Sequence, residues 1–196
     1  MTMTMNRLEG EVRLGFGEVL AQLCDLPGGA TADELEIAMG RVGRNDAPAL
    51  LFDYADDALG WRQLEPVHSV AHAAWSASEY PEDSLGGDDR WSMLFGSYGT
   101  TFYRADGRRR KRPTSVRLYR GAPESRVGRM AWTGSLEVAR RFAQDGLRGR
   151  ELGTVWTVQV PGQALLGHIS DRGEDEYVLH PREARGLADR AVEVAA

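Results

Sequence analysis

Ser115-Val-Arg-Leu-Tyr-Arg120 alternates apolar and polar side chains and lies where the pattern of the chain changes. A period of two is typical of a β-strand with one buried face. Further strand signals follow, because β-branched and aromatic residues dominate 154–160, 177–179 and, more weakly, 191–194. Between them, 136–143 predicts a short helix with Leu136, Ala139, Phe142 and Ala143 on one face. Residues 113–196 are therefore predicted to form a mainly β core.

The part of the chain before this core has the apolar spacing of helices. Apolar residues recur three or four apart over 8–23, and Thr31 with Glu34 has the form of a capping box that opens a second helix. Further helices are predicted over 63–78 and 91–103. Helices first and strands later predict an α+β fold in which residues 1–112 are mainly helical. A length of 196 residues fits a single domain, 1–196.

Composition excludes several classes of site. Cys24 is the only cysteine, so neither an internal disulfide nor a thiolate cluster can form. His68 and His72 have the spacing of two zinc ligands on a helix, but the glutamate of the metalloprotease motif and a third ligand are missing, so we expect no metal.

No apolar run reaches the roughly 20 residues that span a bilayer. We expect no membrane partner and a cytoplasmic site of action, with delivery to another cell without a cleaved signal left open.

Acidic residues outnumber basic residues, 29 to 24. Nothing global therefore indicates nucleic-acid binding, which would require a local basic patch. Such a patch is offered by the run Arg108, Arg109, Arg110, Lys111 and Arg112. A solvated loop before the first predicted strand is the favoured interpretation of this run, and contact with nucleic acid stays open.

Three segments in chain order carry a further pattern. They are Leu118-Tyr-Arg-Gly121, Met130-Ala-Trp-Thr-Gly-Ser-Leu-Glu-Val-Ala-Arg-Arg-Phe142 and Arg172-Gly-Glu-Asp-Glu-Tyr-Val-Leu-His-Pro181. Together they resemble the arginine, Ser-Thr-Ser and Glu-x-Glu elements of ADP-ribosyltransferases of the arginine–serine–glutamate type. The resemblance covers about 115–182 and implies a split β-sandwich core preceded by a group of helices. It also implies an enzyme that cleaves NAD, as co-substrate, at the nicotinamide–ribose bond and transfers ADP-ribose to an acceptor.

The resemblance implies roles for individual residues. Glu176 is the carboxylate that stabilises the positive charge developing on the ribose, and Glu174, expected on the same face of a strand, engages the acceptor. Arg120 binds the pyrophosphate through its planar fork, and the main chain of Gly121 holds the nicotinamide amide.

The Ser-Thr-Ser element falls on residues 131–133, where this chain departs from the family pattern. Ala131 replaces the serine that would orient the catalytic glutamate, whereas Thr133 keeps one hydroxyl and is implied to bind NAD. Trp132 or Phe142 is expected to stack on the nicotinamide ring.

Several alternatives remain open at this level. An arginine on a target protein is the acceptor that Glu-x-Glu implies, with nucleic acid and small molecules as further acceptors. Hydrolysis of NAD by water, an inactive NAD-binding module and an interaction protein without NAD also stay open. Taken singly, Tyr119-Arg120-Gly121 is typical of a strand with a surface ion pair, 172–176 of an exposed acidic turn, and Trp132 and Phe142 of a core.

Overall fold

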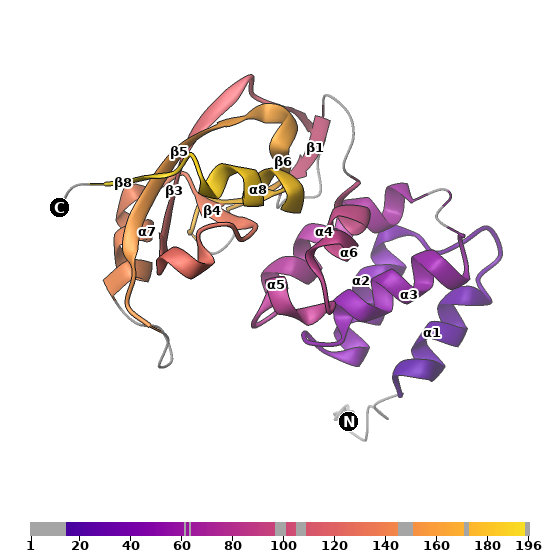
Figure 1. Ribbon diagram of the computed structural model, residues 1–196. Helices are drawn as coiled ribbons and strands as arrows, with labels where there is room; N and C mark the ends of the chain where they lie inside the picture. The colour runs from indigo at the N-terminus through magenta and orange to yellow at the C-terminus, as the bar shows by residue number, and fades with distance from the viewer. Residues whose placement is uncertain are drawn as a thin grey trace, which may run out of the picture.

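The computed structural model describes residues 15–60, 62, 64–96, 101–104, 109–144, 151–170 and 173–194; the side chains of 88, 101–104, 109 and 110 lie outside that description. Figure 1 shows the N-terminal helices gathered on one side and the strands, with two further helices, on the other. The fold class is α+β, as predicted.

Within the described ranges, six helices come first. They are α1 (Phe16–Cys24), α2 (Ala32–Val42), α3 (Ala47–Asp57), α4 (Glu65–Ala77), α5 (Pro81–Ser84) and α6 (Asp88–Phe95). The predicted capping box begins α2, because the Thr31 hydroxyl accepts a hydrogen bond from the Glu34 N–H and the Glu34 carboxylate accepts one from the Thr31 N–H. The helix predicted over 8–23 corresponds to α1, with its residues before 15 outside the described part of the chain.

The predicted helix over 91–103 is wrong in its second half. Helix α6 ends at Phe95 because Gly96 adopts a left-handed conformation with φ 67°. Residues Thr101–Arg104 instead form strand β1, which pairs with β2 (Arg109–Lys111). Both strands lie inside the region that was expected to be mainly helical.

The described strands form one eight-stranded sheet in the order β2-β1-β6-β7-β4-β3-β5-β8. The other strands are β3 (Ser115–Ala122), β4 (Ala131–Thr133), β5 (Thr154–Pro161), β6 (Leu165–Ile169), β7 (Glu176–Leu179) and β8 (Val192–Glu193). Strands β3 and β5 pair along their whole length, whereas β3 and β4 share the single register pair Tyr119↔Thr133. The sheet is therefore nearly divided between β3 and β4.

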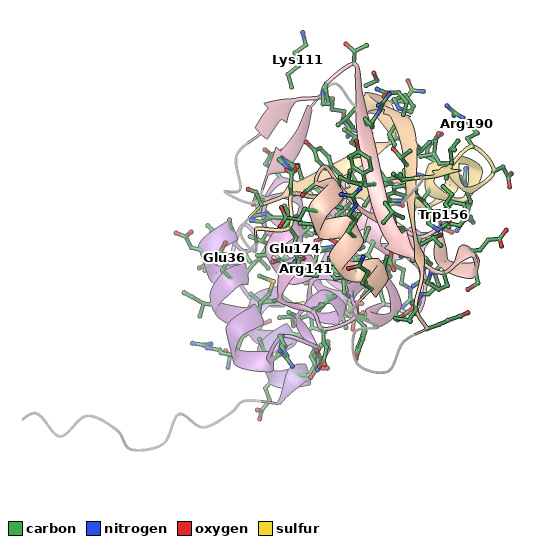
Figure 2. The ribbon with its side chains drawn as sticks, turned by 90° about the vertical axis from the view of Figure 1, so that its left-hand side faces the viewer. Glu36, Lys111, Arg141, Trp156, Glu174 and Arg190 are labelled. Carbon is green, nitrogen blue, oxygen red and sulfur yellow. The ribbon has the colours of Figure 1, made fainter. Side chains whose placement is uncertain are left out.

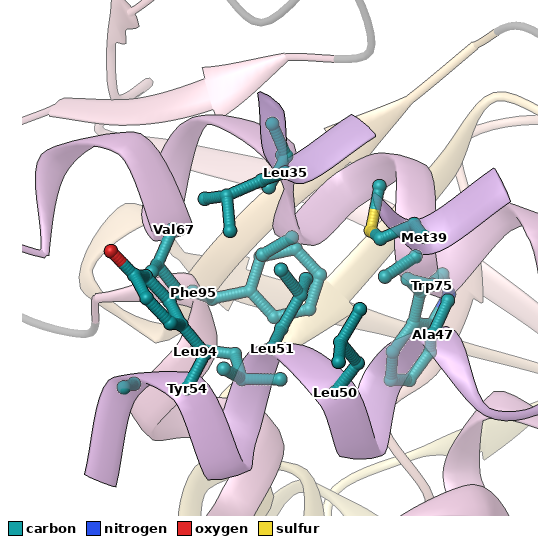
Figure 3. Close-up of a cluster of buried hydrophobic side chains, with 14 of the residues drawn as sticks. Leu35, Met39, Ala47, Leu50, Leu51, Tyr54, Val67, Trp75, Leu94 and Phe95 are labelled. Atoms are coloured by element: carbon teal, nitrogen blue, oxygen red, sulfur yellow. The ribbon is translucent and has the colours of Figure 1, made fainter. Parts of the chain in front are cut away.

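Two hydrophobic clusters lie on the two faces of the central strands. The larger cluster joins the N-terminal helices to Leu166, Ile169 and Val178 of β6 and β7, and part of it is drawn in Figure 3. The smaller cluster packs β3, β4 and β5 against helix α8 (Pro181–Ala188). Burial of this apolar surface is the main favourable term in folding, so the helices and the sheet stabilise each other.

Helix α7 (Leu136–Gln144), which the sequence predicted, packs on β3 at Gly121. A Cβ added to Gly121 would lie 2.0 Å from the carbonyl oxygen of Ala139 and 2.5 Å from the backbone nitrogen of Ala143. No side chain can fit there, so the glycine is required by the contact between strand and helix.

We expect Gly121→Ala to lower the free energy of unfolding by about 2 kcal/mol or more, because backbone atoms of α7 must move to admit the methyl group. Chemical denaturation measures this loss. The matched control is Gly128→Ala, whose added Cβ would meet its nearest atoms at an ordinary 3.5 Å. Equal unfolding midpoints for the two variants would contradict this packing.

Candidate active site

A cleft of about 250 Å³ opens between the segment 78–83, which includes the first three residues of α5, and the edges of β3, β4, α7 and β7. Its lining includes all seven residues that the sequence predicted for catalysis or NAD binding: Arg120, Gly121, Trp132, Thr133, Phe142, Glu174 and Glu176. Figure 2 shows Glu174 where the helices meet the strands. Strands β3 and β4 diverge beyond their single register pair, which leaves room for a hollow at this edge.

Glu176 is the first residue of β7 and is buried. The indole N–H of Trp75, in helix α4, donates a hydrogen bond of 3.0 Å to Oε1 of Glu176. Trp75 is fully buried and lies edge-on to Trp91, with a ring-centroid distance of 4.9 Å. A buried carboxylate needs such partners to offset its loss of hydration. Because 101 positions separate the two residues, no local motif could reveal this contact.

Thr133 holds the turn that carries Glu174. Its hydroxyl donates to the carbonyl oxygen of Glu174 at 2.6 Å and accepts from the N–H of Ser135 at 3.0 Å. The N–H of Gly134 donates to the carbonyl oxygen of Asp175 at 2.9 Å. The hydroxyl of Thr133, which was predicted to contact NAD, is therefore used within the protein to fix the backbone before Glu176.

Asp175 adds a second anchor to the same turn. Its Oδ1 lies 2.6 Å from Nε2 of His168, whose ring stacks on Tyr177 with the ring centroids 4.2 Å apart. Asp175 has φ 44°, the one described residue other than glycine with a positive φ. The turn is thus bonded through both its backbone and its central side chain.

Arg120 lies in the cleft wall with its guanidinium already engaged. Its Nε donates to the carbonyl oxygen of Arg126 at 3.0 Å, one terminal nitrogen donates to the carbonyl oxygen of Ala131, and the other lies 3.5 Å from Oε2 of Glu82. The Glu82 carboxylate also accepts from the N–H of Ala131 at 2.9 Å and from Nε of Arg129 at 3.3 Å. The Glu82 carboxylate, on α5, therefore lies between the side chains of Arg120 and Arg129.

Glu82 is ionised in this setting. Burial raises the pKa of its carboxyl group, but Arg120, the N–H of Ala131, Arg129 and Arg126 lower it more, and the result lies below the ordinary glutamate pKa. This carboxylate could not be predicted from the sequence, because Pro81-Glu82-Asp83-Ser84 carries no recognisable motif.

The two aromatic residues of the predicted site have different environments. Trp132 is only 2% exposed, lies in the smaller hydrophobic cluster and donates its indole N–H to the carbonyl oxygen of Arg129 at 3.0 Å. Its ring is therefore not free to stack on a ligand. Phe142, which was predicted to share one face of the helix with Ala139 and to be a candidate for stacking on nicotinamide, is 37% exposed and lines the cleft.

The basic run does not form a continuous exposed patch in the described part of the chain. Arg112 is buried and donates to the carbonyl oxygens of Gln163 and Leu165, so it is not exposed for contact with nucleic acid. Lys111 is exposed, at a tip of the sheet away from Glu174 in Figure 2. Arg108 and the side chains of Arg109 and Arg110 lie outside the described residues.

Among the described residues, no group of three or more histidine, cysteine, aspartate or glutamate side chains could hold a metal ion. None of the helices in the described ranges has the length and apolar character needed to cross a bilayer.

Comparison of the chain with protein-family models, with curated proteins and with solved structures found no match.

The buried ion pair of Glu82 should make folding depend on pH. We expect Glu82→Gln to lower the free energy of unfolding by about 2 kcal/mol at pH 7, because charge-assisted hydrogen bonds are lost. Since the folded pKa is depressed, this stabilisation is present above the unfolded glutamate pKa of about 4.3 and is lost as the pH falls through the folded pKa. Denaturation at several pH values should therefore show the two proteins converging below about pH 4.

Asp83→Asn is the matched control on the same helix. The side chain of Asp83 is half exposed and pairs with Arg126 and Arg129, and such pairs contribute about 1 kcal/mol or less. A Glu82→Gln deficit no larger than that of the control, or one that is constant from pH 7 to pH 3, would contradict the assigned ion pair.

Proposed function

We propose that this chain is an enzyme of the ADP-ribosyltransferase type, which cleaves NAD at the nicotinamide–ribose bond and transfers ADP-ribose to an acceptor. One observation carries the proposal. The seven residues predicted from three sequence motifs lie on β3, β4, α7, β7 and the turn before β7, and all of them line one cleft. The chemistry requires a carboxylate, a cationic group and an aromatic ring near one ligand, and the cleft provides all three.

The strand arrangement supports a split β-sandwich core of the ADP-ribosyltransferase kind. Strand β3 is paired to β5, and β4 is paired to β7, whereas β3 and β4 share one register pair. A group of helices precedes this core in the chain.

The cleft also has the chemistry to bind a pyrophosphate. Arg120, Arg129 and the N–H of Ala131 already surround one oxyanion, the Glu82 carboxylate, and Arg126 lies beside the same acidic helix. Arginine forks and backbone N–H groups are common phosphate ligands. The pyrophosphate of NAD would take the place of this carboxylate on Arg120.

The remaining cleft residues suit the nucleoside parts of NAD. The ring of Phe142 is exposed to the cleft and can stack on nicotinamide, a role that the buried Trp132 does not fit. Gly121 brings its main chain to the cleft wall without a side chain. We therefore assign ring stacking to Phe142 and keep Gly121 as the backbone contact.

In the proposed reaction the bond between the nicotinamide nitrogen and ribose C1 breaks, and its electron pair leaves with nicotinamide. Positive charge builds on the ribose, and the buried carboxylate of Glu176 stabilises it because the surroundings screen this charge less than water does. The acceptor then bonds to C1 and loses a proton, for which Glu174 is the nearby carboxylate. The acceptor is a protein arginine in this proposal.

Incubation with labelled NAD and a cell lysate tests the proposal. Nicotinamide release with label on protein is the expected result, and label on nucleic acid or small molecules would change the acceptor. NAD binding without nicotinamide release would favour an inactive binding module. Absence of any NAD-induced thermal shift would favour an interaction protein and reject the proposal.

Glu176→Gln should slow nicotinamide release by about 10²- to 10³-fold, because one preorganised contact with the transition state is lost. NAD affinity, measured by calorimetry, should change little. The isosteric amide keeps an acceptor oxygen for the indole N–H of Trp75 and so preserves the fold. Turnover near that of the wild type would remove Glu176 from the mechanism.

Glu174→Gln should separate transfer from cleavage. We expect it to lose most ADP-ribose transfer and to retain hydrolysis of NAD by water, because only the acceptor needs a carboxylate to orient it and receive its proton. Glu176→Gln, assayed in parallel, should lose both activities. Unchanged transfer in Glu174→Gln would reject the acceptor role, and loss of both activities would mean that Glu174 serves the NAD step as well.

A further inference from the structure

Trp75 belongs to the helical half of the chain, yet its indole N–H contacts the carboxylate in the proposed catalytic position. The hydrogen bond from Nε1 to Oε1 of Glu176 measures 3.0 Å and is buried at both ends. Neighbouring positions on β4 do not provide an equivalent donor: Ala131 has no polar side-chain atom, and the hydroxyl of Thr133 donates to the carbonyl oxygen of Glu174.

The indole is itself held rigidly. Its ring lies edge-on to Trp91 and to Phe95, with centroid distances of 4.9 and 5.8 Å. Helix α4 is buried along the same side through Val67, Val70, Ala71 and Ala74, and these residues belong to the cluster that reaches Val178 on β7. A donor fixed by packing on both sides is preorganised and aims one oxygen of Glu176 in a constant direction.

We propose that Trp75 is a positioning residue for the reaction: its N–H fixes the orientation of the Glu176 carboxylate that acts on the ribose. This inference rests on the proposed function. With Trp75 in this role, the N-terminal helices belong to the active site and do not form a separate binding module.

The decisive variant removes the N–H and keeps the ring. Trp75→3-benzothienylalanine replaces N–H by sulfur at nearly constant shape, and Trp75→Phe provides the same loss with natural residues. We expect kcat for nicotinamide release to fall about 10- to 100-fold, as for a misdirected catalytic group. The KM for NAD should stay within about twofold, because the pyrophosphate and ring contacts are unchanged.

Trp156 supplies a matched control. Its indole N–H donates to the carbonyl oxygen of Ala122 at 2.9 Å, and it does not line the cleft. The same replacements there should leave kcat within about twofold of wild type. Urea denaturation of every variant at the assay temperature verifies that each is folded under the conditions in which the kinetics are compared.

A second measurement separates positioning from general packing. In a Glu176→Gln background the Trp75 replacement should cause no further loss of turnover, because the carboxylate through which it acts is already gone. An equal loss in both backgrounds would overturn the inference, as would unchanged kcat in the single variant. Absence of nicotinamide release from the wild-type chain would instead refute the proposed function and, with it, the positioning role of Trp75.

Discussion

The hydrogen bond between Trp75 and Glu176 is the contact on which the arrangement of the cleft depends. It joins residues 101 positions apart and connects the helical half of the chain to the first residue of β7. Burial of a carboxyl group is costly without hydrogen-bonding partners, so the burial of Glu176 depends on the packing of the helices on this face of the sheet. The large hydrophobic cluster meets this requirement, because it runs from the helices across Leu166 and Val178.

A second polar contact also joins the helices to the sheet, elsewhere in the cleft wall. Glu82 on α5 meets Arg120 on β3 and the N–H of Ala131 on β4. The direction of donation differs between the two contacts. In the Trp75–Glu176 contact the helices supply the donor and the sheet supplies the carboxylate. In the Glu82 contact the helices supply the carboxylate and the sheet supplies the donors. In the proposed function the pyrophosphate of NAD would replace Glu82 on Arg120, at a place separate from the hydrogen bond between Trp75 and Glu176.

The sequence predicted elements with strong local signals and missed those defined by distant contacts. The alternation in β3, the β-branched run in β5 and the capping box of α2 were sufficient because each is a local property. Helix α3, strand β6 and helix α8 were missed, since short mixed runs such as 165–169 carry no clear period. The seven motif residues line one cleft, but Trp75 and Glu82 were beyond sequence reasoning because their partners lie on strands far along the chain.

The two glutamates of the Glu-x-Glu segment share the cleft for a reason other than the expected one. Strand alternation was expected to place Glu174 and Glu176 on one face, yet β7 begins only at Glu176, and Asp175 has a φ of 44° that interrupts extended geometry. Such a conformation costs about 1 kcal/mol or more for most residues, although aspartate tolerates it well. Here it is held by the N–H of Gly134 on the Asp175 carbonyl and by His168 on its carboxylate, and any side chain at 134 would collide with that carboxylate at 2.1 Å. The turn, and not the strand, therefore brings Glu174 to the same cleft as Glu176.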